Sequence, residues 1–230
     1  MIYAIIVAAG RGVRMQAAQR KQFLNIGGRP ILLRTLQVFD RCRSVERLLV
    51  VVPSDDMEFC REHILAAAEL KTEIQLVAGG AQRQDSVRNG LDAILEEEGI
   101  VLIHDGVRPL VTQALVEACI QGARQWGACV PAVTAVDTPK LVKHAVIQNT
   151  IPRDSLQLAQ TPQAFKLSLI RHAHQDAKLN KWLVTDDAAI VERLGGRVHI
   201  IPGLRENIKL TTPQDLGLAE YYITCRDQKD

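Results

Sequence analysis

The sequence predicts an α/β fold in which a mostly parallel, twisted β-sheet is covered by helices on both faces. Short apolar runs alternate with longer amphipathic stretches along the chain, which is typical of a parallel sheet. The first run, Ile2–Val7, is continuously apolar and rich in β-branched residues, as expected of a strand buried on both faces. Hydrophobic residues make up 47% of the 230 residues and aromatic residues only 4%, so aliphatic side chains must fill the core.

The strands of this sheet are predicted from short apolar runs bounded by polar, glycine or proline residues. Each run is too short for a typical helix, and most are rich in Val and Ile. The expected strands are Ile2–Val7, Arg47–Val52, Glu73–Val77, Ile100–His104, Ala128–Ala132 and Val198–Ile201.

Helices are predicted where apolar residues recur with helical spacing between the strands. Pro30 suits a first helical turn, and Ser54 can cap the next helix. Thr212 and Asp215 supply an N-cap and an acidic first turn for the last one. The expected helices are Pro30–Asp40, Ser54–Leu70, Asp85–Glu98, Gln113–Trp126, Lys166–Lys178, Asp186–Leu194 and 213–224.

Residues 137–160 interrupt this alternation and contain no long periodic face. Two short strands, Lys140–Lys143 and Val146–Thr150, are expected there as a hairpin that projects from the body. An isolated hairpin is only marginally stable in water, so a projecting arm favours a partner surface and hence a homo-oligomer. An ordinary surface hairpin is the alternative, and the pattern alone does not separate the two.

Composition and charge exclude several classes of protein. The formal net charge is +2 with no long basic block, which argues against a nucleic-acid partner. The five cysteines are scattered and form no CxxC pair, which argues against a disulfide framework or a zinc site. No apolar run is long enough to span a membrane, and the start of the chain has no features of a cleavable leader. A cytoplasmic protein without a membrane partner is therefore expected.

A glycine-rich, cationic segment, AAGRGVRM, follows the first strand. Gly10 and Gly12 resemble the start of a dinucleotide-binding GxGxxG motif, but Met15 stands where the third glycine belongs, which disfavours a nicotinamide-dependent dehydrogenase. Exposed backbone N–H groups together with Arg14 and Lys21 suit a polyphosphate. A solvated surface loop is the alternative.

Polar residues follow two further strands, and ligands of open α/β sheets bind beyond the carboxyl ends of strands. Gly80 and Ser86 are expected at the edge of a pocket that reads a nucleotide base. The alternative is simple helix capping, which for Asp85 alone is favoured over function. In HDGVRP, Asp105 can hold Mg²⁺ or a substrate hydroxyl. Arg108 either pairs structurally with Asp105 or binds a substrate anion.

Taken together, these segments resemble a known family. The motifs AAGRGVRM…KQF, GG…R…DSV, HDGVRP, DT…K, TPQAF, TDDA and NIKLTTPQDL occur in this order from Ala8 to Leu216. They resemble the 2-C-methyl-D-erythritol 4-phosphate cytidylyltransferases of the non-mevalonate isoprenoid pathway. The resemblance implies a single Rossmann-like nucleotidyltransferase domain over 1–230 with an arm at about 137–160. It also implies a homodimer formed through the arm and Mg²⁺-dependent use of CTP.

The resemblance assigns roles by position. Arg14 and Lys21 match residues that stabilise the transition state at the α-phosphate, and Arg153 and Lys209 match residues that position the methylerythritol phosphate. The implied nucleotide-binding residues are Ala8, Ala9, Gly10, Gly12, Gly80, Ala81, Ser86 and Asp105. The implied substrate-binding residues are Asp105, Arg108, Thr138, Arg153, Thr161 and Lys209, with Asp105 also at the metal. Those on the arm are expected to reach the partner subunit's site.

Two departures from the family pattern stand out. Arg20 occupies a position that is often Pro, and Ala81 has no polar side chain where many members have one. Two other functions stay open. A ribitol 5-phosphate cytidylyltransferase is similar in sequence but tends to have LAGG where this chain has AAG. A nucleotide-binding regulator without turnover is the second alternative.

Overall fold

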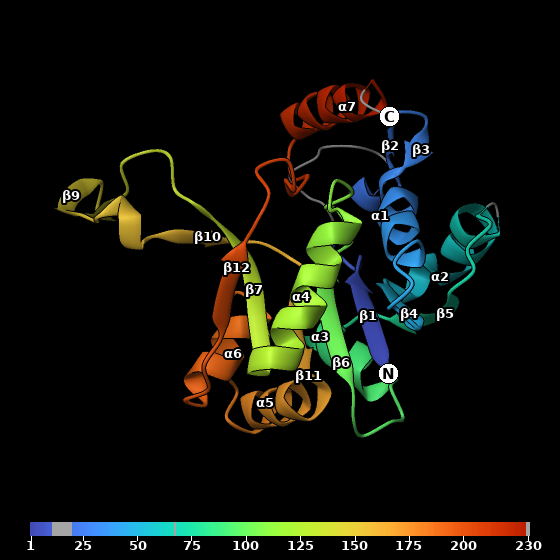
Figure 1. Ribbon diagram of the computed structural model, residues 1–230, viewed down its shortest axis with the longest axis horizontal. Coiled ribbons are helices and arrows are strands. Elements are labelled where there is room, and N and C mark those ends of the chain that lie inside the picture. The colour runs from blue at the N-terminus through green and yellow to red at the C-terminus, as the bar shows by residue number, and fades with distance from the viewer. Residues whose placement is uncertain (11–19, 67, 229–230) are drawn as a thin grey trace.

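The computed structural model describes residues 1–10, 20–66 and 68–228. One eight-stranded sheet runs through the centre of the molecule, with helices on both faces (Figure 1). Most of its strand pairs are parallel. The α/β class that the sequence predicts is confirmed.

Strand β1 (Ile2–Val7) lies in the middle of the sheet. It pairs in parallel with β4 (Arg47–Val52) on one side and with β6 (Ile100–Asp105) on the other. Beyond β4, the strand β5 (Glu73–Ala78) continues the parallel order. All four strands lie where the sequence predicts them, and Asp105 is the last residue of β6.

The other half of the sheet contains antiparallel pairs that the sequence analysis missed. β11 (Gln163–Lys166) lies between β6 and β7 (Ala128–Thr134) and runs antiparallel to both. β10 (Gln157–Ala159) is antiparallel to β7, and β12 (His199–Pro202) is parallel to it. β11 is too short to show a period of its own, so its pairing comes from its two neighbours. The resulting order is β10-β7-β11-β6-β1-β4-β5, with β12 beside β7.

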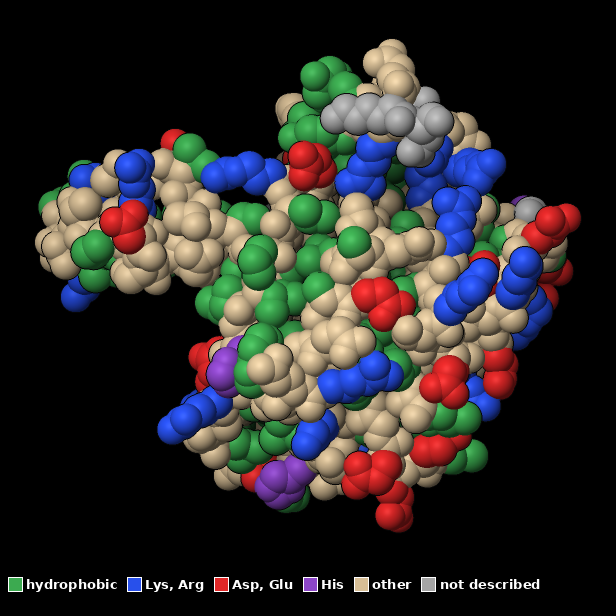
Figure 2. Space-filling view, in the orientation of Figure 1, with side chains coloured by type: hydrophobic (Ala, Val, Ile, Leu, Met, Phe, Trp, Pro, Cys, Tyr) green, Lys and Arg blue, Asp and Glu red, His purple; other side chains and the backbone are tan. Residues whose placement is uncertain are grey.

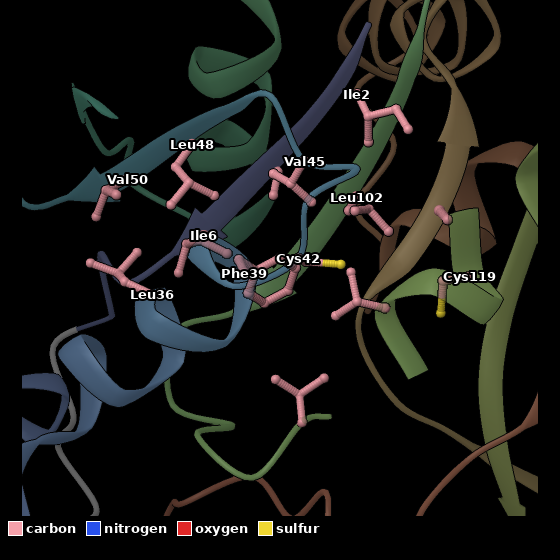
Figure 3. Packing of buried hydrophobic residues seen from close by; sticks show 14 of the residues in the cluster. Ile2, Ile6, Leu36, Phe39, Cys42, Val45, Leu48, Val50, Leu102 and Cys119 are labelled. Carbon is pink, nitrogen blue, oxygen red and sulfur yellow. The ribbon is translucent and has the colours of Figure 1, made fainter. Parts of the chain in front are cut away.

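Helices form two layers that sandwich the sheet (Figure 1). α1 (Ile31–Asp40) and α4 (Gln113–Trp126) contribute buried residues to one apolar cluster. α3 (Arg83–Asp92), α5 (Leu167–Leu179) and α6 (Asp187–Arg193) contribute to the other. Because successive strand residues point to opposite faces, β1 feeds both clusters. Ile6 packs in the first cluster with Leu36 and Phe39 (Figure 3), and Ile5 packs in the second.

A third, smaller cluster lies under α7 (Pro213–Asp227). It joins Ile223 of that helix to Ile26, which belongs to the short pair β2 (Asn25–Ile26) and β3 (Arg29–Pro30). Thr212 is the N-cap and Asp215 lies in the first turn, as predicted, and their side chains form a capping box. The helix runs three residues beyond its predicted end at Thr224.

Two helix predictions were wrong in extent. The predicted helix from Ser54 is instead a 3₁₀ turn, η3 (Ser54–Asp56), then α2 (Met57–Phe59) and a π-helical segment, η4 (Cys60–Leu65). Ser54 lies inside that turn and makes no cap. The helix predicted to end at Glu98 ends at Asp92, because the exposed Leu95 and the acidic residues after it offer no apolar face and are unfavourable at a helix C-terminus.

The predicted hairpin is present as β8 (Lys140–Lys143) and β9 (Val146–Thr150), with the predicted bounds. Every residue of both strands is exposed, including Leu141, Val142 and Ile147. Figure 1 shows this segment extending away from the rest of the molecule. Its apolar residues therefore pack against nothing else in the described part of the chain.

Two expectations about composition can be compared with the structure. All five cysteines are free thiols, and four of them are buried. Within residues 1–10, 20–66 and 68–228, no helix is long and apolar enough to cross a membrane.

Candidate functional site

The principal cavity, of about 570 Å³, opens at the carboxyl ends of β1, β5 and β6. Its size lies within the ordinary range for small-molecule sites. Nine of the predicted site residues line it, namely Ala8, Ala9, Gly10, Lys21, Gly80, Ala81, Ser86, Asp105 and Lys209. The tertiary structure thus gathers segments that are far apart in the sequence, although the role of each residue stays a prediction.

Small residues let the three loops meet. A Cβ atom on Gly79 would lie 2.3 Å from Cβ of Ala9, and one on Gly106 would lie 3.0 Å from Cβ of Ala8. The alanines after β1 are therefore flanked by glycines that follow β5 and β6. Any larger side chain at these positions would push the loops apart.

Two buried polar side chains, Gln22 and Ser86, hold these loops through hydrogen bonds that were not predicted. Gln22 donates from Nε2 to the Ala8 carbonyl at 2.8 Å. Ser86 accepts from the Gly80 N–H at 3.1 Å and donates to the Gln82 carbonyl at 3.0 Å. The Ser86 hydroxyl is thus occupied within the loop, which accounts for its near-complete burial.

Asp105 is the electrostatic centre of the cavity. Its Oδ1 lies 3.1 Å from Nε of Arg83, and its Oδ2 lies 2.9 Å from Nζ of Lys209 and 3.6 Å from Nε of Arg108. Burial opposes the charge of this carboxylate, but Arg83 and then Lys209 outweigh burial and hold the pKa of Asp105 below its usual range. Asp105 therefore stays ionised at neutral pH.

The backbone of Asp105 is fixed by a chain of hydrogen bonds. Its N–H donates to Oγ1 of Thr161 at 3.1 Å, and that hydroxyl lies 3.1 Å from Nδ1 of His104. Nε2 of His104 lies 3.1 Å from the Arg108 carbonyl, which can only accept, so Nε2 carries the proton and Nδ1 accepts from Thr161. Burial lowers the pKa of His104 to about 3, so the imidazole is neutral.

Arg83 joins Asp105 to a second buried carboxylate, which the sequence analysis contained only within the TDDA motif and to which it gave no role. NH1 of Arg83 lies 2.7 Å from Oδ2 of Asp187. Oδ1 of Asp187 accepts from Nε2 of the buried His174 at 3.1 Å. The motifs GG…R…DSV and TDDA contain Arg83 and Asp187, but nothing in the sequence indicated that these two residues are partners.

A second cavity, of about 210 Å³, adjoins the first. Arg83, Asp105 and Lys209 line both cavities. The predicted substrate residues Arg108 and Thr161 line only the smaller one. Arg83, Asp105 and Lys209 therefore form the boundary between the two cavities.

Several predicted site residues lie elsewhere. Thr138 and Arg153 are exposed on the arm and line neither cavity. Gly12 and Arg14 fall outside the residues that the structure describes. Arg20, the departure from the family pattern, pairs with Asp56 at 2.5 Å between Nε and Oδ2.

The fit of a divalent cation can be judged from the side chains present. Within residues 1–10, 20–66 and 68–228, no three His, Cys, Asp or Glu side chains come together as a metal site. Asp105 already accepts from two cations, yet each carboxylate oxygen retains a further acceptor position. Mg²⁺ is commonly held by one carboxylate and substrate phosphates. Asp105 therefore fits Mg²⁺ that arrives with a nucleotide, and not a site made of protein alone.

Comparison with known proteins identifies the family. Residues 2–225 match the family model described as IspD, 2-C-methyl-D-erythritol 4-phosphate cytidylyltransferase. The chain belongs to this family. A cytidylyltransferase of that name from Geobacter metallireducens is 47% identical over 225 residues, covering 96% of this chain and 97% of the relative. One from Geobacillus kaustophilus is 48% identical over 224 residues, covering 97% of each chain.

Solved structures of the family share the fold. The crystal structure of 4-diphosphocytidyl-2C-methyl-D-erythritol synthase from Anaerococcus prevotii superposes with a TM-score of 0.86 at 31% identity. That match covers 97% of this chain and 98% of the other. The cytidylyltransferase from Francisella tularensis gives a TM-score of 0.82 at 29% identity, covering 96% of this chain and 98% of the other. The family resemblance of the sequence is confirmed.

Proposed function

We propose that this protein transfers the cytidylyl group of CTP to 2-C-methyl-D-erythritol 4-phosphate in isoprenoid precursor biosynthesis. The products are 4-diphosphocytidyl-2-C-methyl-D-erythritol and pyrophosphate. Family membership over almost the whole chain supports this reaction. The structural observation that carries it is the pair of adjoining cavities with Arg83, Asp105 and Lys209 between them. Such a pair suits a nucleotide in the larger space and a small phosphorylated acceptor in the smaller one.

The reaction needs no general base from the protein. A phosphate monoester has a second pKa of about 6, so its oxygen is largely deprotonated at neutral pH. That oxygen bonds to the α-phosphorus of CTP, the bond from this phosphorus to the β-bridging oxygen breaks, and pyrophosphate leaves with the electron pair. His104 is neutral with both ring nitrogens engaged, so it is not placed to act as the base.

Catalysis then depends on positioning and on stabilising negative charge. Lys21 and Lys209 approach the larger cavity from two separate segments and suit the triphosphate and the acceptor phosphate. We assign Arg14 and Arg153 to the same task on the family pattern. Mg²⁺, with Asp105 as its protein ligand, would add positive charge at the phosphates.

We also propose that the active protein is a homodimer joined through the arm. The exposed apolar residues of the hairpin, Leu141, Val142, Val146 and Ile147, support a partner surface. Arg153 would then act in the neighbouring subunit, since it lines neither cavity of its own chain. Sedimentation should show a dimer that Leu141→Ser with Ile147→Ser converts to a folded monomer. A wild-type monomer would contradict this proposal.

We expect the reaction to take place in the cytoplasm. The free thiols of all five cysteines are in keeping with a reducing compartment.

Pyrophosphate release from CTP and Mg²⁺ tests the function. Parallel reactions contain 2-C-methyl-D-erythritol 4-phosphate, ribitol 5-phosphate or no acceptor. We expect release only with the methylerythritol substrate. Release only with ribitol phosphate would retain the chemistry and change the pathway. CTP binding without release in any reaction would favour the regulator.

A further inference from the structure

We propose that Arg83 is a positioning residue for this reaction, held from behind by the buried Asp187–His174 pair and fixing Asp105 at the boundary between the two cavities. The inference rests on the proposed function and adds residues to which neither the sequence motifs nor the family match gives a role. Asp187 and His174 affect the substrates only through Arg83.

The geometry of Arg83 suits a bridge between two carboxylates. Its Nε and NH1 atoms reach Asp105 at 3.1 Å and Asp187 at 2.7 Å. The planar guanidinium presents fixed donors in two directions at once, which a lysine ammonium on a flexible stem does not. The side chain of Arg83 is 27% exposed, whereas those of Asp105 and Asp187 are 8% and 1% exposed. Arg83 thus lies at the cavity wall with one carboxylate facing the ligands and one behind it.

Asp187 is firmly anchored where it meets Arg83. It is the first residue of α6, and its backbone N–H donates to Oε1 of Gln163 at 3.1 Å. The same glutamine donates from Nε2 to Asp186, the N-cap of that helix, at 2.8 Å. The backbone of Asp187 is therefore held to β11 at the start of α6, which limits how far its carboxylate can follow Arg83 if the arginine moves.

His174 completes the support from α5. It is 1% exposed, and its Nε2 donates to Asp187 at 3.1 Å. Nδ1 of His174 is buried and has no hydrogen-bond partner among the residues that the structure describes. Its polar contact is thus directed at Asp187. A buried carboxylate left without partners is strongly destabilising, so Arg83 and His174 together keep Asp187 in place.

A purely structural role does not account for this arrangement. Arg83 lines both cavities, and Asp187 lines neither. Asp105 shares its two oxygens between Arg83 and Lys209, and Lys209 is the more exposed of these two partners, at 37% against 27%. If Lys209 turns toward a phosphate, Arg83 remains as the fixed partner of Asp105. Removing the charge of Asp187 frees Arg83 to turn into the cavity, which misplaces Asp105.

The test compares variants on the two sides of the cavity wall. We expect Arg83→Gln to lower kcat/KM for the acceptor on the order of 10²-fold, the loss typical of misplaced groups. We expect Asp187→Asn to lower it roughly 10-fold although Asp187 touches neither cavity, at the low end of losses for supporting contacts. The matched control is Arg88→Gln, which breaks the Arg88–Asp85 pair on the same helix. Its kcat and KM should stay within about twofold of wild type, because Arg88 lines neither cavity.

Two further variants separate positioning from folding. Arg83→Lys keeps the charge but cannot bridge, so it should restore less than half of the lost activity. Adding Asp187→Asn to Arg83→Gln should cost no further activity if Asp187 acts through Arg83. Wild-type activity of Asp187→Asn, or multiplied losses in the double variant, would overturn the proposal. All values are measured well below each variant's melting temperature, so lost stability alone does not lower them.

The outcome is also separable from the proposed function. If wild type releases no pyrophosphate, that function fails, and the affinity for CTP replaces kcat/KM as the readout. A loss of CTP affinity in Arg83→Gln that the added Asp187→Asn does not deepen would retain the positioning role. Unchanged affinity in both variants would overturn it.

Discussion

The cavity and the arm differ in how far their side chains are buried and paired. In the cavity, Asp105 is buried and bonded to Arg83 and Lys209. On the arm, every residue of β8 and β9 is exposed, whether polar or apolar. Figure 2 shows the arm as a separate lobe that carries Lys and Arg side chains beside apolar ones. The body of the site is thus prepared within one chain, while the arm offers residues that this chain does not use.

The difference follows from the cost of burying charge. A charged side chain taken out of water costs several kcal/mol unless it is paired with good geometry. Each buried carboxylate at the cavity wall therefore requires its cationic partner, and Asp105 and Asp187 are both paired with Arg83 before any ligand binds. The apolar residues of the arm hairpin stay more than half exposed, so the described part of the chain does not determine what they contact.

The largest expected effect is on the cavity side. Lys21→Ala should lower kcat by roughly 10²-fold or more, because one preorganised charge that stabilises the transition state is lost. Steady-state pyrophosphate release measures it, with Lys21→Arg as the variant that keeps the charge. A Lys21→Ala protein with wild-type kcat would remove Lys21 from this role.

The next prediction tests whether the arm completes a neighbouring site. Arg153→Ala alone should be nearly inactive. Mixing it with inactive Lys21→Ala should recover about a quarter of wild-type activity, because half of the reassorted dimers carry one site with both residues intact. The mixture is assayed after subunit exchange is verified by mass. No recovery despite subunit exchange would contradict a role for Arg153 in the neighbouring subunit's site.

A third prediction concerns how the cavity loops fit together. Gly79→Ala should destabilise the protein by about 1–3 kcal/mol, the usual cost of overpacking. Its Cβ would lie 2.3 Å from Ala9 Cβ, whereas a Cβ on Gly10 would meet no described residue within 4 Å. Urea unfolding of Gly79→Ala and Gly10→Ala measures the contrast. Equal stabilities would show that the loops adjust freely.

The smallest effect is expected at α7, outside both regions. Burial opposes the charge of Asp215, but the N–H groups of Thr211 and Thr212 outweigh it and lower the pKa of this carboxyl. Its contribution to stability is therefore present above the unfolded pKa and is lost as pH falls through the folded pKa. Asp215→Asn should cost about 1 kcal/mol at pH 7, as loss of a helix cap does, and nothing at strongly acidic pH.

Urea unfolding at several pH values checks this prediction. Activity per folded molecule should stay at the wild-type level, because Asp215 lines neither cavity. A loss of stability that is the same at every pH would contradict the role of its charge.

Local pattern explains which elements could be predicted. Strands such as β1 and β6, and helix α4, have continuous or periodic apolar residues, so their positions follow from the sequence. β11 has no such signal, since a four-residue strand between two others is fixed by its neighbours. The segment after Ser54 has helical spacing and was therefore predicted as one helix. The chain there instead changes from 3₁₀ to α to π geometry.

The α/β class, the segments that end in the cavity and the family all follow from contiguous stretches of sequence. Which charges meet follows from the fold instead. Arg83, Asp105, His174, Asp187 and Lys209 come from five separate segments, and their contacts arise from strand order and helix packing. No local pattern encodes such a contact, because the energy that fixes a buried charge depends on partners that the chain brings together only when it folds.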